Sequence, residues 1–177
     1  MQNDGKLTAF QSAWVVDDIE KAAMEWVESA GVGPFFVAEY SQGVLLDTFY
    51  REQPTPITMF TALTQVGDMQ LELIQPTGTQ PNVYRDTVPA GHTAFHHSCL
   101  WSEDFAGDLA RYSRQGFEIA ARGRIEGGPA FAYVDTHITL GHMTELLERT
   151  DEIVEIFDMI AATAARWNGK NPIRGYD

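Results

Sequence analysis

The feature that most constrains this chain is a pattern of predicted elements that occurs twice. In its first occurrence, FQSAWVV (residues 10 to 16) alternates in polarity as a strand does, and residues 17 to 30 change to a helical period that ends at Gly31. Three further runs have strand composition and are separated by stretches containing Gly or Pro, at residues 35 to 40, 57 to 66 and 69 to 76.

The same order returns in the second half of the chain. AFHHSCLW (residues 94 to 101) is typical of a strand, and residues 102 to 115 carry apolar side chains at helical spacing. Gly116 then ends the predicted helix. Three more strands are predicted at residues 117 to 123, 129 to 135 and 142 to 148.

The two copies are in register, because Gln11 precedes the helix start at Asp17 by six residues and His97 precedes Glu103 by six. The sequence therefore predicts an α+β fold built from two tandem βαβββ modules and an additional C-terminal helix. The alanine-rich face of that helix can cover the sheet or pack on a second subunit. The predicted segments are a first module at 8–75, a connector at 76–93, a second module at 94–149, and a C-terminal helix and tail at 150–177.

Charge and composition exclude several classes of partner. The formal net charge is −13, with 12 Lys and Arg against 25 Asp and Glu, so a basic surface for nucleic acid or anionic membrane is not expected. The sequence contains neither a leader-like start nor an apolar run long enough to span a bilayer, and we expect a cytoplasmic protein. Cys99 is the only cysteine, so a metal would be held by His, Asp, Glu or neutral oxygen atoms.

Four residues of metal-ligand type occupy matching places in the two modules. Gln11 and His97 lie on the opening strands, and Glu72 and Glu145 lie in the apolar closing strands LELIQP and TELLERT. Taken singly, each is more often a surface or packing residue, but independent surface residues have no reason to fall in register. Because a buried carboxylate needs a partner or a cation, the pattern predicts a shared divalent metal.

The donor set restricts the metal and leaves room for a substrate. One imidazole, two carboxylates and one amide oxygen suit an octahedral zinc, nickel, cobalt, manganese or iron ion with two open positions. Under simple strand alternation His96 points to the opposite face from His97, and we expect it to pack or form a hydrogen bond there. The other histidines, His92, His137 and His142, fall in connectors or turns.

These motifs together resemble the vicinal oxygen chelate superfamily, which includes glyoxalase I, methylmalonyl-CoA epimerase, extradiol dioxygenases and bleomycin-resistance proteins. The resemblance covers roughly residues 8 to 149 and is carried in order by QSAWVVDDIEKA, MQLELIQP, FHHSCLWSEDF and AYVDTHITLGHMTELLE. GVGPFF and YRD resemble the glyoxalase-like branch. The resemblance implies a U-shaped mixed sheet around a metal held by Gln11, Glu72, His97 and Glu145.

The resemblance also implies an activity. A Gln, Glu, His, Glu set is similar to that of glyoxalase I, which implies a metal-dependent lyase or isomerase that forms an enolate from an α-oxygenated carbonyl compound. Glu145 is the first candidate for the proton shuttle and Glu72 the second. The alternatives are an epimerase of the methylmalonyl-CoA type, a drug-binding protein of the bleomycin-resistance type and a catalytically silent structural dimer. We expect a homodimer, with the modules paired within one chain or exchanged between subunits.

Aromatic residues supply the candidates for a substrate pocket. A bulky hydrophobic or aromatic ketone is consistent with them, although core packing is the simpler role for each. Arg122 and Arg124 can hold an anion or act only in surface solubility. The candidate substrate-binding residues are Phe35, Phe36, Phe60, Phe131 and Tyr133, with Tyr40 beside them.

Overall fold

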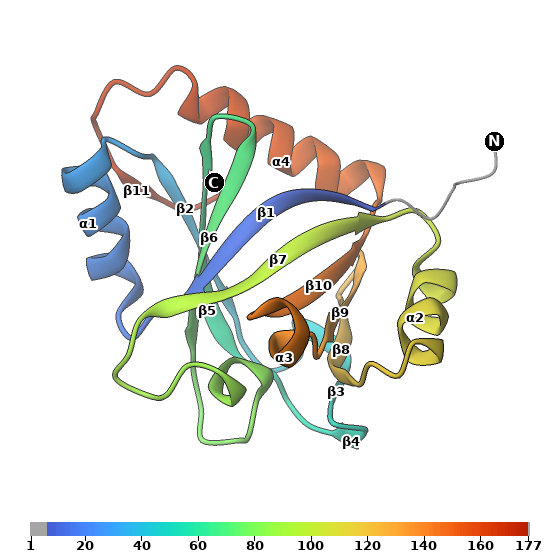
Figure 1. The fold of residues 1–177 in the computed structure, drawn as a ribbon. Coiled ribbons are helices and arrows are strands. Elements are labelled where there is room, and N and C mark those ends of the chain that lie inside the picture. The colour runs from blue at the N-terminus through green and yellow to red at the C-terminus, as the bar shows by residue number, and fades with distance from the viewer. Residues whose placement is uncertain (1–6, 177) are drawn as a thin grey trace.

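The structure of the protein, a computed structural model, describes residues 7–176. These residues form one eleven-stranded mixed sheet with the order β11-β2-β5-β6-β1-β7-β10-β9-β8-β3-β4, flanked by helices (Figure 1). The predicted α+β class with a C-terminal helix is confirmed. The elements of the first half are β1 (Thr8–Val15), α1 (Ile19–Ala30), β2 (Phe35–Tyr40), β3 (Leu45–Tyr50), β4 (Gln53–Pro54), β5 (Met59–Val66) and β6 (Met69–Pro76).

The second half begins with a 3-10 helix in the connector and repeats the order of strands and helix. A short helix, absent from the sequence prediction, lies between its last two long strands. The elements are η1 (Val83–Asp86), β7 (Ala94–Ser102), α2 (Phe105–Arg114), β8 (Ile119–Ile125), β9 (Ala130–Val134), α3 (His137–Leu140), β10 (Met143–Glu148), α4 (Asp151–Ala164) and β11 (Ile173–Arg174).

The centre of the sheet has an approximate twofold arrangement within the chain. β1 and β7 pair antiparallel, with Ser12 opposite Ser98 at the midpoint of the paired residues. β6 pairs parallel with β1, and β10 pairs parallel with β7, so each opening strand is bordered by the closing strand of its own half. The two halves therefore meet through their opening strands, and their closing strands lie at equivalent places on either side.

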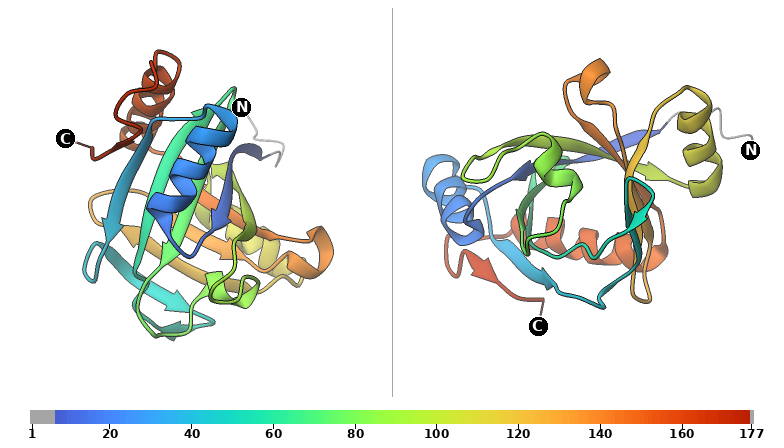
Figure 2. Two further views of the ribbon diagram at one scale, coloured as in Figure 1. Left: turned by 90° about the vertical axis from the view of Figure 1, so that its left-hand side faces the viewer. Right: turned by 90° about the horizontal axis from the view of Figure 1, so that it is seen from below.

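One hairpin was not predicted from the sequence. β3 and β4 are inserted between the second and third predicted strands of the first half, and β3 pairs with β8 of the second half. Its turn holds Arg51 and Glu52 at φ 44° and 64°, a left-handed region usually occupied by Gly or Asn, so the common sequence signal of a hairpin is missing. β2 and β3 lie near opposite ends of the strand order but are joined by a short loop. The two ends of the sheet are therefore close together, and the sheet curves into a cup (Figure 2).

Helices α1 and α4 lie on opposite faces of the sheet. The Asp18 side chain accepts a hydrogen bond from the Lys21 amide at the start of α1, and this helix packs on the outer face against Leu71 and Leu73. α4 begins where Thr150 accepts from the Ile153 amide and covers the inner face (Figure 2). Among the described residues, no helix has both the length and the apolar character to cross a membrane.

Candidate metal centre and cavity

The four predicted metal ligands lie on one face of the four central strands. Glu72 and His97 flank Ala13 in one row across the strands, and Gln11 and Glu145 belong to the next row on the same face. All four residues are nearly inaccessible to solvent, with exposed fractions of 4% for Gln11, 9% for Glu72, 0% for His97 and 7% for Glu145.

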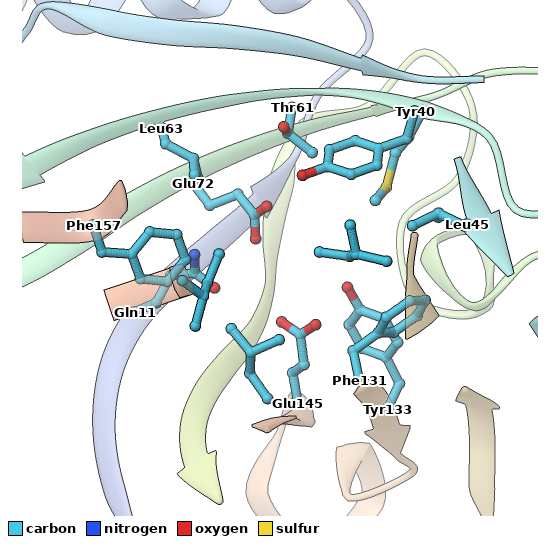
Figure 3. A pocket seen from close by; sticks show the side chains of 14 residues that line it. Gln11, Tyr40, Leu45, Thr61, Leu63, Glu72, Phe131, Tyr133, Glu145 and Phe157 are labelled. Atoms are coloured by element: carbon cyan, nitrogen blue, oxygen red, sulfur yellow. The ribbon is translucent and has the colours of Figure 1, made fainter. Parts of the chain in front are cut away.

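The nitrogen and carboxylate oxygens converge on a common point. His97 Nε2 lies 2.9 Å from Glu145 Oε2 and 3.6 Å from Glu72 Oε2, and one ligand atom from each of these residues lies within 4.8 Å of the others. His97 Nε2 is nevertheless buried without a hydrogen bond of acceptable geometry. Figure 3 shows the carboxylates of Glu72 and Glu145 facing each other, with the Gln11 amide beside them. An unpartnered imidazole nitrogen between two carboxylates is the geometry that a cation would complete.

The electrostatics of this cluster favour a positive charge. Burial, and then the nearby carboxylate of Glu145, raise the pKa of Glu72 well above its usual value. Burial and the same two glutamates also raise the pKa of the Cys99 thiol, which keeps that thiol neutral. A divalent ion would relieve the repulsion between the two carboxylates, and the oxygen-rich donor set fits such an ion.

The amide of Gln11 is held in a defined orientation. Its Nε2 donates a hydrogen bond of 2.6 Å to Gln70 Oε1, a residue that lies beside it on β6. With the amide nitrogen committed to Gln70, the Oε1 atom of Gln11 is the atom left to act as a metal ligand.

The structure places His96 differently from the sequence prediction. Ala13 pairs with His97 and Trp14 pairs with Phe95, so His96 is an extra residue on β7 at a β-bulge. Alternation fails at a bulge, and the Nδ1 atoms of the two adjacent rings lie 2.9 Å apart. The prediction that His96 faces away from His97 is therefore wrong. The ring of His96 instead packs against the rings of Tyr84 and Tyr133 and that of His97 itself.

A cavity opens beside the carboxylates and is walled mainly by apolar and aromatic side chains (Figure 3). Its empty space is about 550 Å³, a figure that includes open solvent at its mouth. Burial, followed by the charges of Glu72 and Glu145, raises the pKa of Tyr40 to about 12, so its hydroxyl stays protonated. The lining residues are Gln11, Tyr40, Leu45, Met59, Thr61, Leu63, Glu72, Ile125, Phe131, Tyr133, Glu145, Leu147, Ile153 and Phe157.

The predicted aromatic lining is divided between this cavity and the protein core. Phe131 and Tyr133 line the cavity. Phe35 and Phe60 pack with the residues beneath α1 on the outer face, and Phe36 packs with Ile160 of α4. Strand parity separates these positions, because neighbouring residues on a strand face opposite sides of the sheet.

Two arginines lie away from the cavity, and one helix contributes to its wall. Arg122 lies 4.2 Å from the ring centre of Phe49, and Arg124 donates to the Gly128 carbonyl, so both make their contacts away from the cavity wall. Ile153 and Phe157 of α4 contribute to the wall. The helix follows the duplicated core in the sequence, and the apolar stripe of α4 does not distinguish a cavity wall from ordinary packing.

Comparison with known proteins agrees with the fold. A methylmalonyl-CoA epimerase from Mycobacterium tuberculosis is 14% identical with a TM-score of 0.59, covering 88% of this chain and 97% of its own. The Streptomyces coelicolor methylmalonyl-CoA epimerase bound to 2-nitronate-propionyl-CoA is 17% identical with a TM-score of 0.57, covering 82% and 97%. A hypothetical protein from Bacillus halodurans C-125 is 12% identical with a TM-score of 0.56, covering 82% and 96%.

Comparison of the sequence with known families identifies the superfamily of this chain. No curated protein sequence matches the chain significantly. The sequence profile of the glyoxalase/bleomycin resistance protein/dioxygenase superfamily matches residues 10–133, which include most of β1 and all of β6 and β7. The chain therefore belongs to the glyoxalase/bleomycin resistance protein/dioxygenase superfamily.

Proposed function

We propose that this protein is a metal-dependent lyase or isomerase of the glyoxalase-like type, acting through an enolate on an α-oxygenated carbonyl compound. The observation that carries the proposal is the buried, unpartnered Nε2 atom of His97 between the carboxylates of Glu72 and Glu145. Gln11, Glu72, His97 and Glu145 would hold a divalent zinc, nickel, cobalt, manganese or iron ion. Such an ion, when bound, supplies Lewis acidity toward a substrate carbonyl oxygen.

The protein's own side chains can carry out the proton transfer. We assign Glu145 as the first candidate for the group that removes a proton from the carbon beside the carbonyl, and Glu72 as the second. Both carboxylates border the cavity, and they come from opposite halves of the chain. The protonated hydroxyl of Tyr40 borders the same space and can donate a hydrogen bond to an oxygen atom of the substrate.

The cavity wall supports an apolar or aromatic substituent on the substrate. Leu63, Phe131 and Phe157 present hydrocarbon surface close to the carboxylates. Burial of such a substituent would exclude water from the proton-transfer step and orient the reacting carbon. A bulky hydrophobic or aromatic ketone with an adjacent oxygen function is the substrate class that these contacts favour.

Metal content tests the proposed centre. We expect about one divalent ion per wild-type chain, and loss of that ion in His97→Ala and Glu145→Gln, measured by elemental analysis after purification with added metal. Glu39→Gln is the matched control, since Glu39 is an exposed carboxylate on a strand of the same sheet. Equal metal content in all four proteins would refute the centre. A metal-free wild type that holds an aromatic ligand would favour a non-catalytic binding protein.

An epimerase is the second candidate, and one observation favours it. Glu72 and Glu145 face each other across the site, so one carboxylate can remove a proton from one side of a carbon while the other returns a proton to the opposite side (Figure 3). In deuterated solvent, an epimerase would return substrate of inverted configuration carrying deuterium, whereas a lyase or isomerase would accumulate a different compound. Either activity should fall about 10²–10⁴-fold in Glu145→Gln if Glu145 is the proton shuttle.

The assembly of the protein is a separate proposal. We expect a cytoplasmic homodimer, and sedimentation analysis of the purified chain would test the dimer. The pairing of β1 with β7 joins the two halves within one chain, so such a dimer would not require exchanged modules.

A further inference from the structure

We infer that His96 is a positioning residue for the candidate metal centre, because it accepts a hydrogen bond from Nδ1 of His97 and thereby reserves Nε2 of His97 for a metal. This inference rests on the proposed function, which makes His97 a ligand. It concerns a residue outside the four ligands, and it explains why two histidines are adjacent in this strand.

The first step fixes the protons on His96. Its Nε2 lies 3.2 Å from the backbone oxygen of Val83, and since a carbonyl can only accept, Nε2 carries the hydrogen. The ring is fully buried, and its two nitrogens contact only the Val83 carbonyl and the Nδ1 atom of His97. In a neutral imidazole only one nitrogen is protonated, so Nδ1 of His96 is an acceptor.

The second step transfers this constraint to His97. The Nδ1 atoms of His96 and His97 are 2.9 Å apart, so His97 must be the donor. Its remaining nitrogen, Nε2, is the atom that faces Glu72 and Glu145 without a hydrogen bond of acceptable geometry. The backbone carbonyl of Val83 thus sets the tautomer of His97 through the ring of His96. Metal-bound histidines commonly have their second nitrogen held by a carboxylate or carbonyl, and here His96 takes that place.

The first half of the chain contains an equivalent bulge, with which the bulge at His96 can be compared. A second bulge in the β1 and β7 pairing makes Phe10 the extra residue before Gln11, just as His96 is the extra residue before His97. Phe10 is apolar and stacks on Trp101 at 3.8 Å, while Gln70 orients Gln11 from the neighbouring strand. The bulge by itself therefore does not require a polar residue. His96 lies at the bulge that precedes His97, the candidate ligand with an imidazole ring.

Two substitutions of similar size separate the hydrogen bond from packing. In His96→Asn the side-chain oxygen lies near the former Nδ1 position and can accept from His97, whereas in His96→Leu no acceptor remains. Zn²⁺ affinity, measured by competition with a chelating dye, should fall about 10–100-fold in His96→Leu. It should stay within about threefold of wild type in His96→Asn. Equal Zn²⁺ affinities for the two variants would overturn the inference.

The tautomer can be tested without any metal. In metal-free wild type at neutral pH, ¹⁵N NMR of the His97 ring should show a protonated Nδ1, and an unprotonated Nδ1 would overturn the inference. The variants' circular dichroism and thermal unfolding show whether each one is folded, and the wild-type NMR result decides the matter if His96→Leu is not. A wild type that keeps this tautomer but binds none of the divalent ions of zinc, nickel, cobalt, manganese and iron would refute the proposed function and leave the hydrogen-bond assignment standing.

Discussion

Glu72 carries a carboxylate that its surroundings disfavour in the absence of a metal. Burial and the charge of Glu145 raise its pKa well above the usual 4.5. A group whose pKa is higher in the folded state stabilises the fold most at pH values below its unfolded pKa, and that stabilisation is lost as the pH rises toward the folded pKa. The metal-free protein should therefore lose stability through Glu72 as the pH increases from about 4.5 toward neutrality.

Replacing Glu72 with glutamine isolates this effect. In metal-free protein, we expect Glu72→Gln to be more stable than wild type at neutral pH, with the difference shrinking as the pH falls toward 4.5. With Zn²⁺ added, wild type should be more stable than Glu72→Gln, because wild type keeps a metal ligand that the variant lacks. Urea unfolding across this pH range, with and without metal, measures both differences. A difference independent of pH and of metal would contradict the assignment.

At the scale of elements, the hairpin of β3 and β4 is attached to the second half by the pairing of β3 with β8 and by the ion pairs of one arginine. Arg51 lies 2.9 Å from Asp86 of η1 and 3.1 Å from Asp135 after β9, and it also pairs with Glu118. Although burial opposes the shift, hydrogen bonds from His137 and Arg51 hold the pKa of Asp135 below its usual range. Because β3 brings Leu45 to the cavity wall, this cluster also supports the cavity.

Arg51→Met should release the hairpin from this cluster. It would leave the carboxylates of Asp86, Glu118 and Asp135 without their shared cation, and we expect a loss of about 1–2 kcal/mol in unfolding free energy at neutral pH, small because the cluster is partly exposed. The lowered pKa of Asp135 gives stability that is present above about pH 4 and lost on acidification, so the loss should diminish at lower pH and in 1 M salt. Arg122→Met, whose arginine faces the Phe49 ring, is the control. Equal losses in both variants would show that the carboxylates are not the cause.

Considered as a whole molecule, the protein has its candidate ligands distributed equally over its two halves. Gln11 and Glu72 belong to the first half, and His97 and Glu145 to the second. The halves are already joined by the pairing of β1 with β7. A bound ion would add a second connection that exists only in the folded chain, so it should stabilise the whole fold.

Thermal unfolding provides the measurement at this scale. Zn²⁺ at a hundred times its dissociation constant should contribute about 2.7 kcal/mol, which for a chain of this size corresponds to a Tm increase of roughly 5–10 °C. His97→Ala should show little or no increase at the same concentration. An equal increase in both proteins would indicate that Zn²⁺ binds elsewhere.

Much of this arrangement could be predicted from sequence, because regular strands obey simple parity. Gln11, His97, Glu72 and Glu145 were placed on matching strands, and the structure brings all four together. The segment boundaries at residues 75, 93 and 149 stay predictions.

The features that sequence analysis missed arise where local rules give no signal. The bulge at His96 reverses the expected alternation, and nothing in the residue types of AFHHSCLW marks it. The turn at Arg51 and Glu52 has left-handed residues without Gly or Asn. The contact of α4 with the cavity depends on long-range packing, which an amphipathic pattern does not specify.

The twofold pairing about Ser12 and Ser98 has a consequence for how such a site can evolve. In a dimer of identical half-length chains, every change near the axis is made twice, so two like ligands must always face each other. Once both halves are on a single polypeptide, each can change alone. The chain can then place an amide opposite an imidazole, and a phenylalanine where the other half has a histidine. The two sides of the candidate metal centre therefore differ chemically, and an asymmetric ligand would have a preferred direction of entry.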